Sequence, residues 1–261
     1  MKKTVVIKYG GHAMTDQTLK ENFAKNIIAI FEQNIKPIIV HGGGPQINSL
    51  LKRLGIVPQF INGLRVTDKA TMEAVEMTLC GSVNKAITAQ INKFKPNAVG
   101  ISGKDANLIR ARQPADKIQL GLVGEVKKVN SSIIKTLINN NFIPVIAPVG
   151  IGEDNKTYNI NADTAAGGIA AALCADSLIL ITDVNGILDK SGKLLKRVNA
   201  EKIEKMIAEQ VITAGMIPKI KCAISALTQG VKSVRIVNGK KSDIISDILI
   251  FGKNAGTEII L

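Results

Sequence analysis

Pro37-Ile38-Ile39-Val40-His41-Gly42-Gly43-Gly44-Pro45 joins a short apolar run to a glycine triplet and a proline. The run has the β-branched composition of a buried strand, and proline is favoured in the first turn of a helix. The same succession occurs earlier, where Thr4 to Ile7 precedes Lys8-Tyr9-Gly10-Gly11 and a helical pattern from Asp16 to Gln33. This repeated unit of strand, glycine loop and helix predicts an α/β fold.

The rest of the chain continues the alternation of strands and helices. Strands are expected at residues 57–66 (broken by the turn Asn62-Gly63), 97–101, 108–111, 122–129, 142–148, 178–182, 233–237 and 258–261, and helices at 45–54, 67–93, 131–140, 162–173, 201–210 and 220–228. Such alternation favours parallel strands connected by helices that cover both faces of the sheet. We predict a three-layer αβα sandwich around a mostly parallel open sheet, with residues 1–261 as a single domain.

The chain has a formal net charge of +13, from 34 Lys and Arg against 21 Asp and Glu. Such an excess suits either a nucleic-acid partner or anionic small molecules. The basic residues are scattered as singles and pairs such as Lys127-Lys128, which favours a solvated surface. Binding of single strands also needs aromatic platforms, and the chain has no Trp, 2 Tyr and 6 Phe. We expect no nucleic-acid partner and keep nucleic-acid binding as a minor alternative.

Cysteine and histidine usage bears on compartment and metals. Cys80, Cys174 and Cys222 lie far apart, without C-x-x-C pairing and each in an apolar helical pattern, which predicts reduced core thiols and a cytoplasmic protein. His12 and His41 have no second His or Cys at metal-ligand spacing, so no metal site is expected. The first apolar run is too short for a signal peptide, and no run of about 18 apolar residues predicts a membrane span.

Three common site motifs are absent. Gly150-Ile151-Gly152 leads to Asn155 rather than to the last glycine of G-x-G-x-x-G, and Gly186 to Lys193 has one residue too many for a P-loop. The glycine triplet after His41 resembles the oxyanion loop of lipase-like hydrolases, but their G-x-S-x-G nucleophile motif is missing. Backbone N–H groups and lysines without a covalent nucleophile suit phosphoryl transfer, which needs positioning and neutralisation of charge. A small-molecule kinase is therefore the favoured class.

Taken singly, the polar residues near the loops have ordinary structural explanations. Lys8 is compatible with a surface lysine at a strand end, and Lys219 with a first-turn residue of a helix. Asp163 fits a helix N-cap or first-turn acid, and Arg65 a solvated charge beside a hairpin. Turn chemistry explains Asn159 nearly as well as a binding role. Only their joint occurrence favours a site.

Six short segments stand in order along the chain. They are Lys8-Tyr9-Gly10-Gly11, His41-Gly42-Gly43-Gly44-Pro45, Asn62-Gly63-Leu64-Arg65-Val66-Thr67, Asn159-Ile160-Asn161-Ala162-Asp163, Thr182-Asp183-Val184-Asn185-Gly186-Ile187-Leu188 and Gly215-Met216-Ile217-Pro218-Lys219. Together they resemble the amino acid kinase family and, within it, the acetylglutamate kinases. The likeness runs from the first strand to the last, so it is far more specific than any one glycine loop.

The resemblance implies transfer of the γ-phosphoryl group of ATP, accompanied by Mg²⁺, to the side-chain carboxylate of N-acetyl-L-glutamate, as a step of arginine biosynthesis. It further implies that Lys8 and Lys219 are catalytic and neutralise charge on the transferring group, while Asp163 orients both. Two ammonium groups at one site repel unless a carboxylate lies between them. The acceptor carboxylate is already ionised at pH 7, so no general base is needed.

The resemblance also implies binding residues. The N–H groups of Gly10-Gly11 would hold the phosphoryl oxygens, and those of Gly43-Gly44 the acceptor. Arg65 and Asn159 would bind the α-carboxylate, Arg65 through a charge-assisted pair. The nucleotide pocket would be lined by Thr182, Asp183, Val184, Asn185, Gly186, Ile187, Leu188, Val211, Ile212 and Thr213.

The resemblance also leads to expectations about the two parts of the chain, its oligomeric state and its acceptor. Residues 1–175 would bind the acceptor and residues 176–261 the nucleotide, and a homodimer is expected. Arginine-inhibited relatives carry a helix ahead of the first strand, and here that strand is expected to begin by about Thr4, which argues against the arginine-inhibited hexamer. The alternatives are a kinase of the same fold for another acceptor, such as carrier-linked aminoadipate or glutamate, and a non-catalytic amino-acid or nucleotide sensor.

Overall fold

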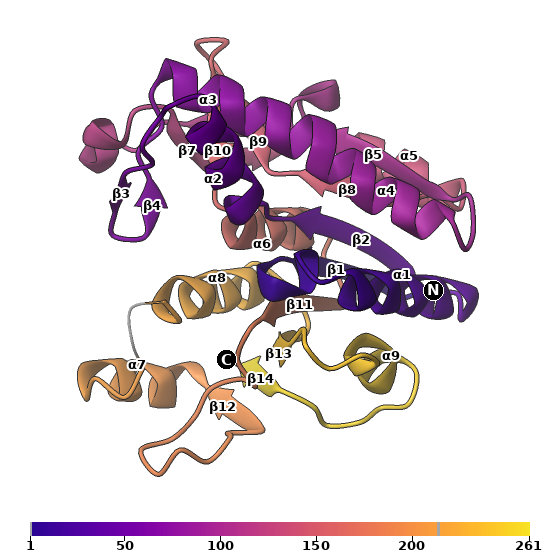
Figure 1. Cartoon of the computed structure of the whole chain (residues 1–261). Coiled ribbons are helices and arrows are strands. Elements are labelled where there is room, and N and C mark those ends of the chain that lie inside the picture. The colour runs from indigo at the N-terminus through magenta and orange to yellow at the C-terminus, as the bar shows by residue number, and fades with distance from the viewer. Residues whose placement is uncertain (1, 213–214) are drawn as a thin grey trace.

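An eight-stranded sheet runs through the molecule in the order β12-β14-β13-β11-β1-β2-β8-β5 (Figure 1). The computed structural model describes residues 2–212 and 215–261. The strands are β1 (Thr4–Tyr9), β2 (Lys36–His41), β5 (Ala98–Ser102), β8 (Ile143–Ala147), β11 (Ser177–Thr182), β12 (Arg197–Asn199), β13 (Val234–Asn238) and β14 (Thr257–Ile260). Within the described residues, all neighbours in this sheet run parallel except β13 and β14. The predicted mostly parallel open sheet is confirmed.

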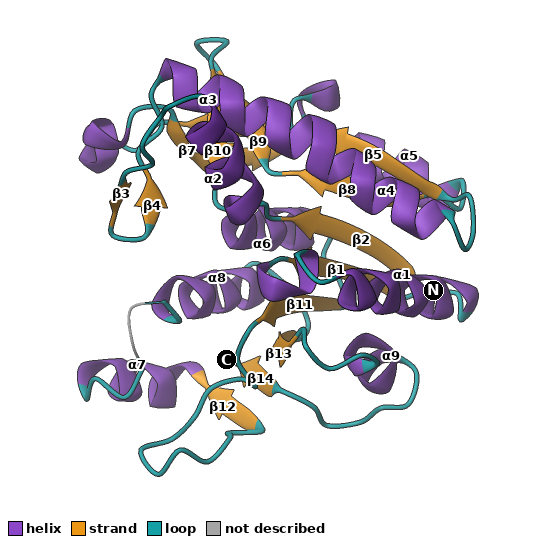
Figure 2. Ribbon diagram, viewed as in Figure 1, coloured by secondary structure: helices purple, strands orange, loops and turns teal. Residues whose placement is uncertain are grey.

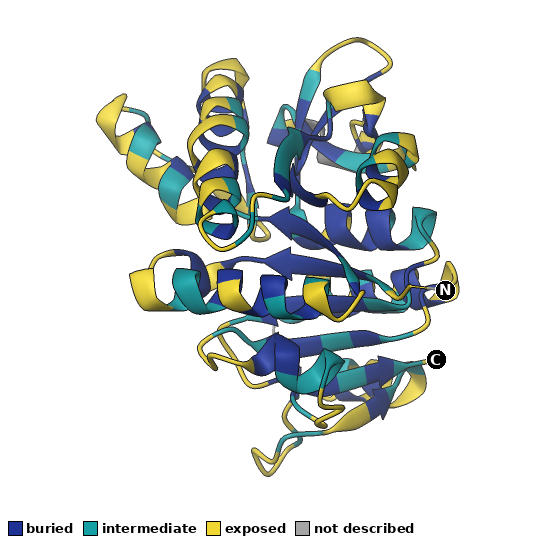
Figure 3. Cartoon of the chain, turned by 90° about the vertical axis from the view of Figure 1, so that its right-hand side faces the viewer, coloured by how far each residue is buried: buried dark blue, intermediate teal, exposed yellow. Residues whose placement is uncertain are grey.

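Helices cover both faces of the sheet, because successive side chains of a strand point to opposite sides. Val5 and Ile7 of β1 pack with one group of helices, and Val6 packs with the other. The first group is α1 (Gln17–Glu32), α4 (Asn84–Asn92) and α9 (Ile244–Leu249); the second is α5 (Ser132–Asn139), α6 (Ala162–Ala172), α7 (Ala200–Ala208) and α8 (Ile217–Thr228). Figure 3 shows the buried sheet between helices with exposed outer faces. The three predicted layers are present.

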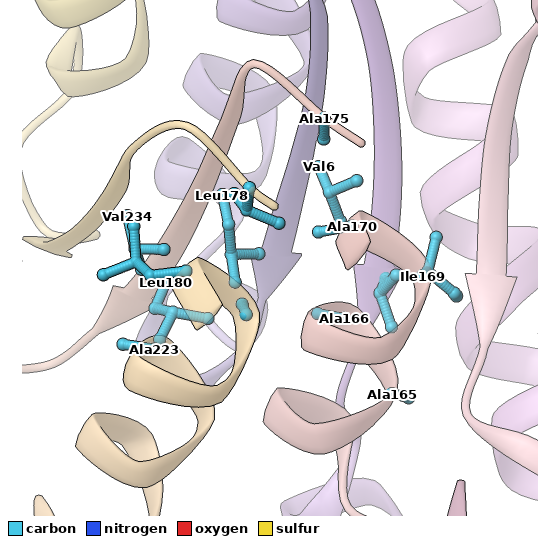
Figure 4. Packing of buried hydrophobic residues seen from close by; sticks show 14 of the residues in the cluster. Val6, Ala165, Ala166, Ile169, Ala170, Ala175, Leu178, Leu180, Ala223 and Val234 are labelled. Atoms are coloured by element: carbon cyan, nitrogen blue, oxygen red, sulfur yellow. The ribbon is translucent and has the colours of Figure 1, made fainter. Parts of the chain in front are cut away.

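Small side chains let α6 lie close to its neighbours. Ala165, Ala166 and Ala170 of α6 are buried in one cluster with Val6 of β1 (Figure 4). The alanine-rich composition of this segment predicted a tightly packed helix, and the structure confirms it. Short side chains shorten the distance between packed elements, so the polar first turn of α6 comes close to the end of β1.

A smaller barrel and a hairpin stand beside the main sheet, in the upper part of Figure 2. The barrel contains β10 (Thr157–Ile160), β7 (Val123–Val129), β6 (Ile109–Arg112) and β9 (Val149–Gly152) in that order. The hairpin pairs β3 (Phe60–Ile61) with β4 (Leu64–Arg65) across Asn62 and Gly63, whose φ angles are 51° and 77°. Positive φ at both central residues is what Asn-Gly turns favour, and it confirms the predicted hairpin.

The long helix predicted over 67–93 is present but not uniform. It consists of α3 (Lys69–Glu76), a π-helical segment η2 (Met77–Val83) and α4. Helix α2 (Gly44–Arg53) begins at the last glycine of the triplet, and short 3₁₀ helices occur at η1 (Gly11–Met14), η3 (Asp105–Asn107) and η4 (Ala115–Leu120). Sequence periodicity did not indicate the π-helical segment, because its composition is that of an ordinary helix, and it did not indicate β9, β12 and α9, which are short.

The structure also tests the expectations about the cysteines and about a membrane span. Cys174 was expected in the core, but it is exposed in the turn after α6 with φ 46°, so that prediction is wrong. Helix α6 ends at Ala172, and the left-handed backbone of Cys174 belongs to the turn that follows it, where the residue is exposed. Cys80 and Cys222 are partly buried. None of the described helices is long and apolar enough to cross a membrane.

Candidate active site

Three charged side chains from distant parts of the chain meet at the end of the central strands. Lys8 Nζ, near the end of β1, lies 3.2 Å from Asp163 Oδ1, and Lys219 Nζ lies 2.7 Å from Asp163 Oδ2. Asp163 is in the first turn of α6 and Lys219 in the first turn of α8. One carboxylate thus bridges two ammonium groups.

Burial makes this arrangement electrostatically demanding. Lys8 is 8% exposed and Asp163 6%. Burial lowers the pKa of Lys8, and the attraction of Asp163 opposes that effect without cancelling it. Burial alone would raise the pKa of Asp163, but the two lysines outweigh it and hold the pKa below its usual value. Asp163 is therefore ionised at neutral pH, and the group of three carries net positive charge when both lysines are protonated.

The first turn of α6 is fixed by a cap. Asn161 precedes the helix, and its Oδ1 accepts hydrogen bonds from the N–H groups of Asp163 at 2.9 Å and Thr164 at 3.2 Å. Satisfying these otherwise free N–H groups anchors the helix start. Asp163 is thus a first-turn acid rather than the cap itself. Its carboxylate is held beside the lysines by the cap and by the packing of α6.

The first glycine loop passes directly beneath these charges. A Cβ on Gly10 would stand 2.9 Å from Lys8 Nζ, and one on Gly11 would stand 2.6 Å from Asp183 Oδ1. Gly11 also has φ +73°, a conformation that disfavours other residues. The loop therefore approaches two opposite charges, Lys8 and Asp183, more closely than any residue with a side chain could.

The second glycine loop forms the start of α2. Gly43 is the N-cap of this helix, and Gly44 is its first residue. The first N–H groups of a helix lack intrahelical partners and favour anions. Among the described atoms, none lies within 4 Å of a Cβ placed on Gly44, so this side of the loop is open. Gly43 and Gly44 are therefore suited to donate to an anionic acceptor.

Arg65 is buried rather than solvated. It is 7% exposed, its guanidinium stacks on Phe60 at 4.7 Å, and its Nη2 donates to Asn48 Oδ1 at 2.7 Å. Burial lowers its pKa. Its Nη1 is buried and, within the described part of the chain, has no hydrogen-bond partner. An unsatisfied buried cation of this kind suits a ligand carboxylate.

Asn159 is connected to Arg65 through one hydroxyl group. Asn159 Nδ2 donates to Thr67 Oγ1 at 3.2 Å, and that hydroxyl donates to the Arg65 carbonyl at 2.8 Å. The two residues predicted to bind the α-carboxylate thus belong to one hydrogen-bonded chain. Asn48 and Thr67 were not singled out as site residues, because an asparagine in a helix and a threonine before one have many ordinary roles.

The segment predicted to bind nucleotide is a loop that leaves β11 and remains partly open. The N–H of Ile187 donates to Thr257 Oγ1 at 2.8 Å, Asn185 Oδ1 accepts from Asn238 at 2.9 Å, and Val184 and Leu188 are both 46% exposed. Gly186 has φ +140°. The other members of the segment are Thr182 at the end of β11 and Asp183 beside Gly11.

A cavity of about 780 Å³ lies next to this loop. It is lined by Asp189, Lys190, Ser191, Asn199, Glu201, Lys202, Lys205, Met206, Glu209 and Val211. Of the residues predicted to bind nucleotide it contains Val211, while Ile212 is buried and Thr213 lies outside the described residues. Most of its lining comes from the region of α7, which sequence reasoning did not assign to a site.

The layered fold with two glycine loops at the strand ends is that of the amino acid kinase family, to which the chain belongs: the model of that family matches residues 3–238. Among its relatives are two acetylglutamate kinases. That of Geobacter sulfurreducens is 47% identical over 267 residues, 98% of this chain and 91% of the relative. That of Solidesulfovibrio magneticus is 50% identical over 268 residues, which cover 99% of this chain and 90% of the relative. The solved structure of smu.665 from Streptococcus mutans UA159 matches with a TM-score of 0.83 and 33% identity over 99% of both chains.

Proposed function

We propose that this protein is a phosphotransferase that transfers the γ-phosphoryl group of ATP to the side-chain carboxylate of N-acetyl-L-glutamate, in arginine biosynthesis. The products are N-acetyl-L-glutamyl 5-phosphate and ADP. Relatives named acetylglutamate kinase, 47% to 50% identical over nearly the whole chain, support the activity and the acceptor. The structural observation that supports it best is the buried carboxylate of Asp163 between two lysines.

The chemistry requires stabilisation of charge more than proton transfer. A carboxylate oxygen of the acceptor forms the new bond to the γ-phosphorus, the bond to the β,γ-bridging oxygen breaks, and ADP leaves with that electron pair. Lys8 and Lys219 neutralise the charge that spreads over the transferring group. Asp163 holds the two ammonium groups at a fixed separation and bears no role as a base, because its lowered pKa keeps it ionised and paired.

Binding of the two substrates divides between the two parts of the chain. Gly10 and Gly11 donate backbone N–H groups to phosphoryl oxygens, and Gly43 and Gly44 donate to the reacting carboxylate. Loss of one preorganised donor costs about 2.7–4 kcal/mol of transition-state stabilisation in comparable sites. Arg65 binds the α-carboxylate through its buried Nη1, an atom that has no hydrogen-bond partner among the described residues.

The nucleotide lies against residues 182–188 and 211–213, and residues 1–175 and 176–261 serve acceptor and nucleotide respectively. Within the described residues, no group of three or more His, Cys, Asp or Glu side chains gathers as a metal site. Mg²⁺ usually binds through substrate phosphates and one or two carboxylates, so we propose that it enters with ATP. We also propose that the protein is cytoplasmic and forms a homodimer.

The test is ADP release from Mg-ATP by the purified protein. N-acetyl-L-glutamate, glutamate, aspartate, carbamate and UMP are offered separately, and the acyl phosphate is trapped as its hydroxamate. ADP formation selective for N-acetyl-L-glutamate supports the proposal. Selectivity for another acceptor keeps the family chemistry and overturns the roles of Arg65 and Asn159. No turnover with any acceptor, although ATP binds, favours a sensor or a carrier-linked substrate and overturns the proposal.

A further inference from the structure

The second glycine loop rests on two buried polar residues that have no role in the proposed binding of substrates. His41 is the last residue of β2, and Asn84 begins α4 directly after the π-helical segment. Both are 0% exposed. A fully buried imidazole and a fully buried amide are costly unless they are hydrogen-bonded, so their contacts indicate what they hold in place.

The contacts of Asn84 assign the protonation of His41. The Asn84 side-chain nitrogen lies 2.9 Å from the Val145 carbonyl oxygen, 3.2 Å from that of Ile101 and 3.1 Å from His41 Nε2. Carbonyl oxygens only accept hydrogen bonds, so the Asn84 atom that faces all three is its NH₂ group. His41 Nε2 therefore faces a group that cannot accept a hydrogen bond, which favours a free lone pair and no hydrogen on that nitrogen.

The other ring nitrogen completes the assignment. His41 Nδ1 lies 2.8 Å from the Gly42 carbonyl oxygen, which again only accepts. The hydrogen of the neutral ring is consequently on Nδ1 and points at that carbonyl. Burial lowers the pKa of His41 to about 4, in keeping with a ring that stays neutral. A second proton on Nε2 would face the NH₂ group of Asn84.

The bond to Gly42 determines which way the next peptide faces. The Gly42 N–H donates to the Tyr9 carbonyl at 2.8 Å, as a continuation of the sheet, and its own carbonyl is held by His41. In a planar trans peptide the C=O and the following N–H point in opposite directions. By turning the Gly42 carbonyl toward the ring, His41 turns the Gly43 N–H away from it, on the side where α2 begins.

The π-helical segment supports the same loop from behind. A Cβ on Gly43 would stand only 2.5 Å from Leu79 Cδ2 and 3.5 Å from Val83 Cγ2. Segment η2 therefore packs directly on the Gly43 backbone and ends at Val83, directly before Asn84. A π-helical turn changes the rotation of the residues after it relative to an α-helix, and such turns are frequent at functional sites.

We propose that His41 and Asn84 are positioning residues, which fix the peptide between Gly42 and Gly43 so that the Gly43 N–H is presented to the reacting carboxylate of the acceptor. The inference rests on the proposed function, because it takes the acceptor to bind at Gly43 and Gly44. Neither residue touches a reacting atom; both act through the backbone of the loop.

The first test measures the tautomer of His41 in the unmodified protein by ¹⁵N NMR of the imidazole nitrogens. The chain has 2 histidines, so a His12→Gln variant assigns the signals. We expect Nδ1 protonated, Nε2 unprotonated and no titration between about pH 5 and pH 8. A proton on Nε2, or titration near the ordinary histidine pKa, overturns the proposal. This measurement does not depend on the identity of the acceptor.

The second test separates the two nitrogens by substitution. The amide of asparagine reaches the position of Nδ1, and that of glutamine reaches the position of Nε2. If the bond to Gly42 orients the loop, His41→Asn keeps a KM for N-acetyl-L-glutamate roughly tenfold lower than His41→Gln does. The KM for ATP stays equal in the two variants. Equal KM values for the acceptor, or a parallel rise in the KM for ATP, contradict the proposal.

The third test is the variant Asn84→Ala. Its control is Asn26→Ala, which also removes a buried side-chain amide. Asn26 is 3% exposed and donates to the Asn22 and Ser242 carbonyls, away from the loop. Both variants lose stability, but only Asn84→Ala raises the KM for the acceptor; a similar effect of Asn26→Ala contradicts a positioning role. If Asn84→Ala does not fold, the NMR measurement of the His41 tautomer in the unmodified protein tests the proposal instead. If the wild type phosphorylates none of the acceptors, the proposed function fails, while the tautomer still tests the geometry.

Discussion

Lys219 and Asp163 lie 56 residues apart in the sequence, yet Nζ of the lysine is 2.7 Å from Oδ2 of the acid. The two residues belong to the first turns of α8 and α6, which pack side by side on one face of the sheet (Figure 1). The contact therefore connects the two parts of the chain proposed to bind acceptor and nucleotide. Asp163 holds the ammonium group of Lys219 in place, so little reorganisation is needed when phosphate binds.

Substitution of Lys219 by alanine should lower kcat much more than it raises KM. The ammonium charge matters most when negative charge spreads in the transition state, and loss of one such group costs on the order of 10²–10³ in kcat. Lys8→Ala should behave in the same way. Steady-state kinetics with both substrates varied measures the effect. Lys221→Ala, an exposed lysine of the same helix, serves as control. A raised KM with normal kcat would falsify the catalytic role.

Arg65→Ala should raise the KM for the acceptor and leave the affinity for ATP nearly unchanged. The guanidinium loses its pairing with the α-carboxylate, and a buried pair of this type is worth about 1.5–3 kcal/mol, or roughly 10-fold to 150-fold. Arg65→Lys should recover little, because an ammonium group cannot bond both Asn48 and the ligand in one plane. Arg53→Ala, an exposed arginine on α2, is the control. Equal weakening of both substrates would place Arg65 outside the acceptor site.

The pH profile of kcat/KM should show an alkaline limb from Lys8. Burial lowers the pKa of this lysine despite the opposing attraction of Asp163, so the ammonium group loses its proton below the ordinary lysine pKa of about 10.4. Activity is therefore full below the lowered pKa and falls as the pH rises through it. Lys8→Arg stays protonated throughout, and its residual activity should lack this limb. An unchanged limb in Lys8→Arg would assign the titration to another group.

Gly167→Ala should destabilise the protein and separate α6 from α8. A Cβ at Gly167 would stand 2.6 Å from Cys222 Sγ, and overpacking of this kind costs about 1–3 kcal/mol. Because α6 carries Asp163 and α8 carries Lys219, kcat should fall together with the melting temperature. The double variant Gly167→Ala/Cys222→Ala should recover much of both, since the next atom is the Cys222 carbonyl oxygen at 3.6 Å. Additive losses in the double variant would refute the contact as the cause.

Local sequence signals predicted most of the sheet and its helices. The apolar runs of β1, β2, β8 and β11 are continuous because these strands are buried on both faces. Asn62-Gly63 specified its hairpin through positive φ at both residues. The π-helical segment escaped prediction, since its composition is that of an ordinary helix. What distinguishes it is contact of Leu79 with the backbone of Gly43, which belongs to another element.

The site was predicted less completely than the fold. The motifs indicated Lys8, Asp163, Lys219, Arg65 and the glycine loops, because glycine at a strand end and charge at a helix start are visible locally. Asn48 and Thr67 were missed, as were His41 and Asn84 as a bonded pair. Their roles arise from distances between elements, and no local periodicity encodes which asparagine will face a particular arginine or imidazole.

The sequence by itself determined the alternation of buried strands and helices and the two glycine loops, because side-chain burial and backbone freedom are properties of a few consecutive residues. It also determined membership of the family, through six motifs in a fixed order. Only the tertiary structure decided that Lys8 and Lys219 share one carboxylate, that Arg65 is buried with an Nη1 that has no hydrogen-bond partner among the described residues, and that His41 Nδ1 lies beside the Gly42 carbonyl. Each of these depends on how separate elements pack, since burial and hydrogen-bond partners are set by neighbours that are distant along the chain.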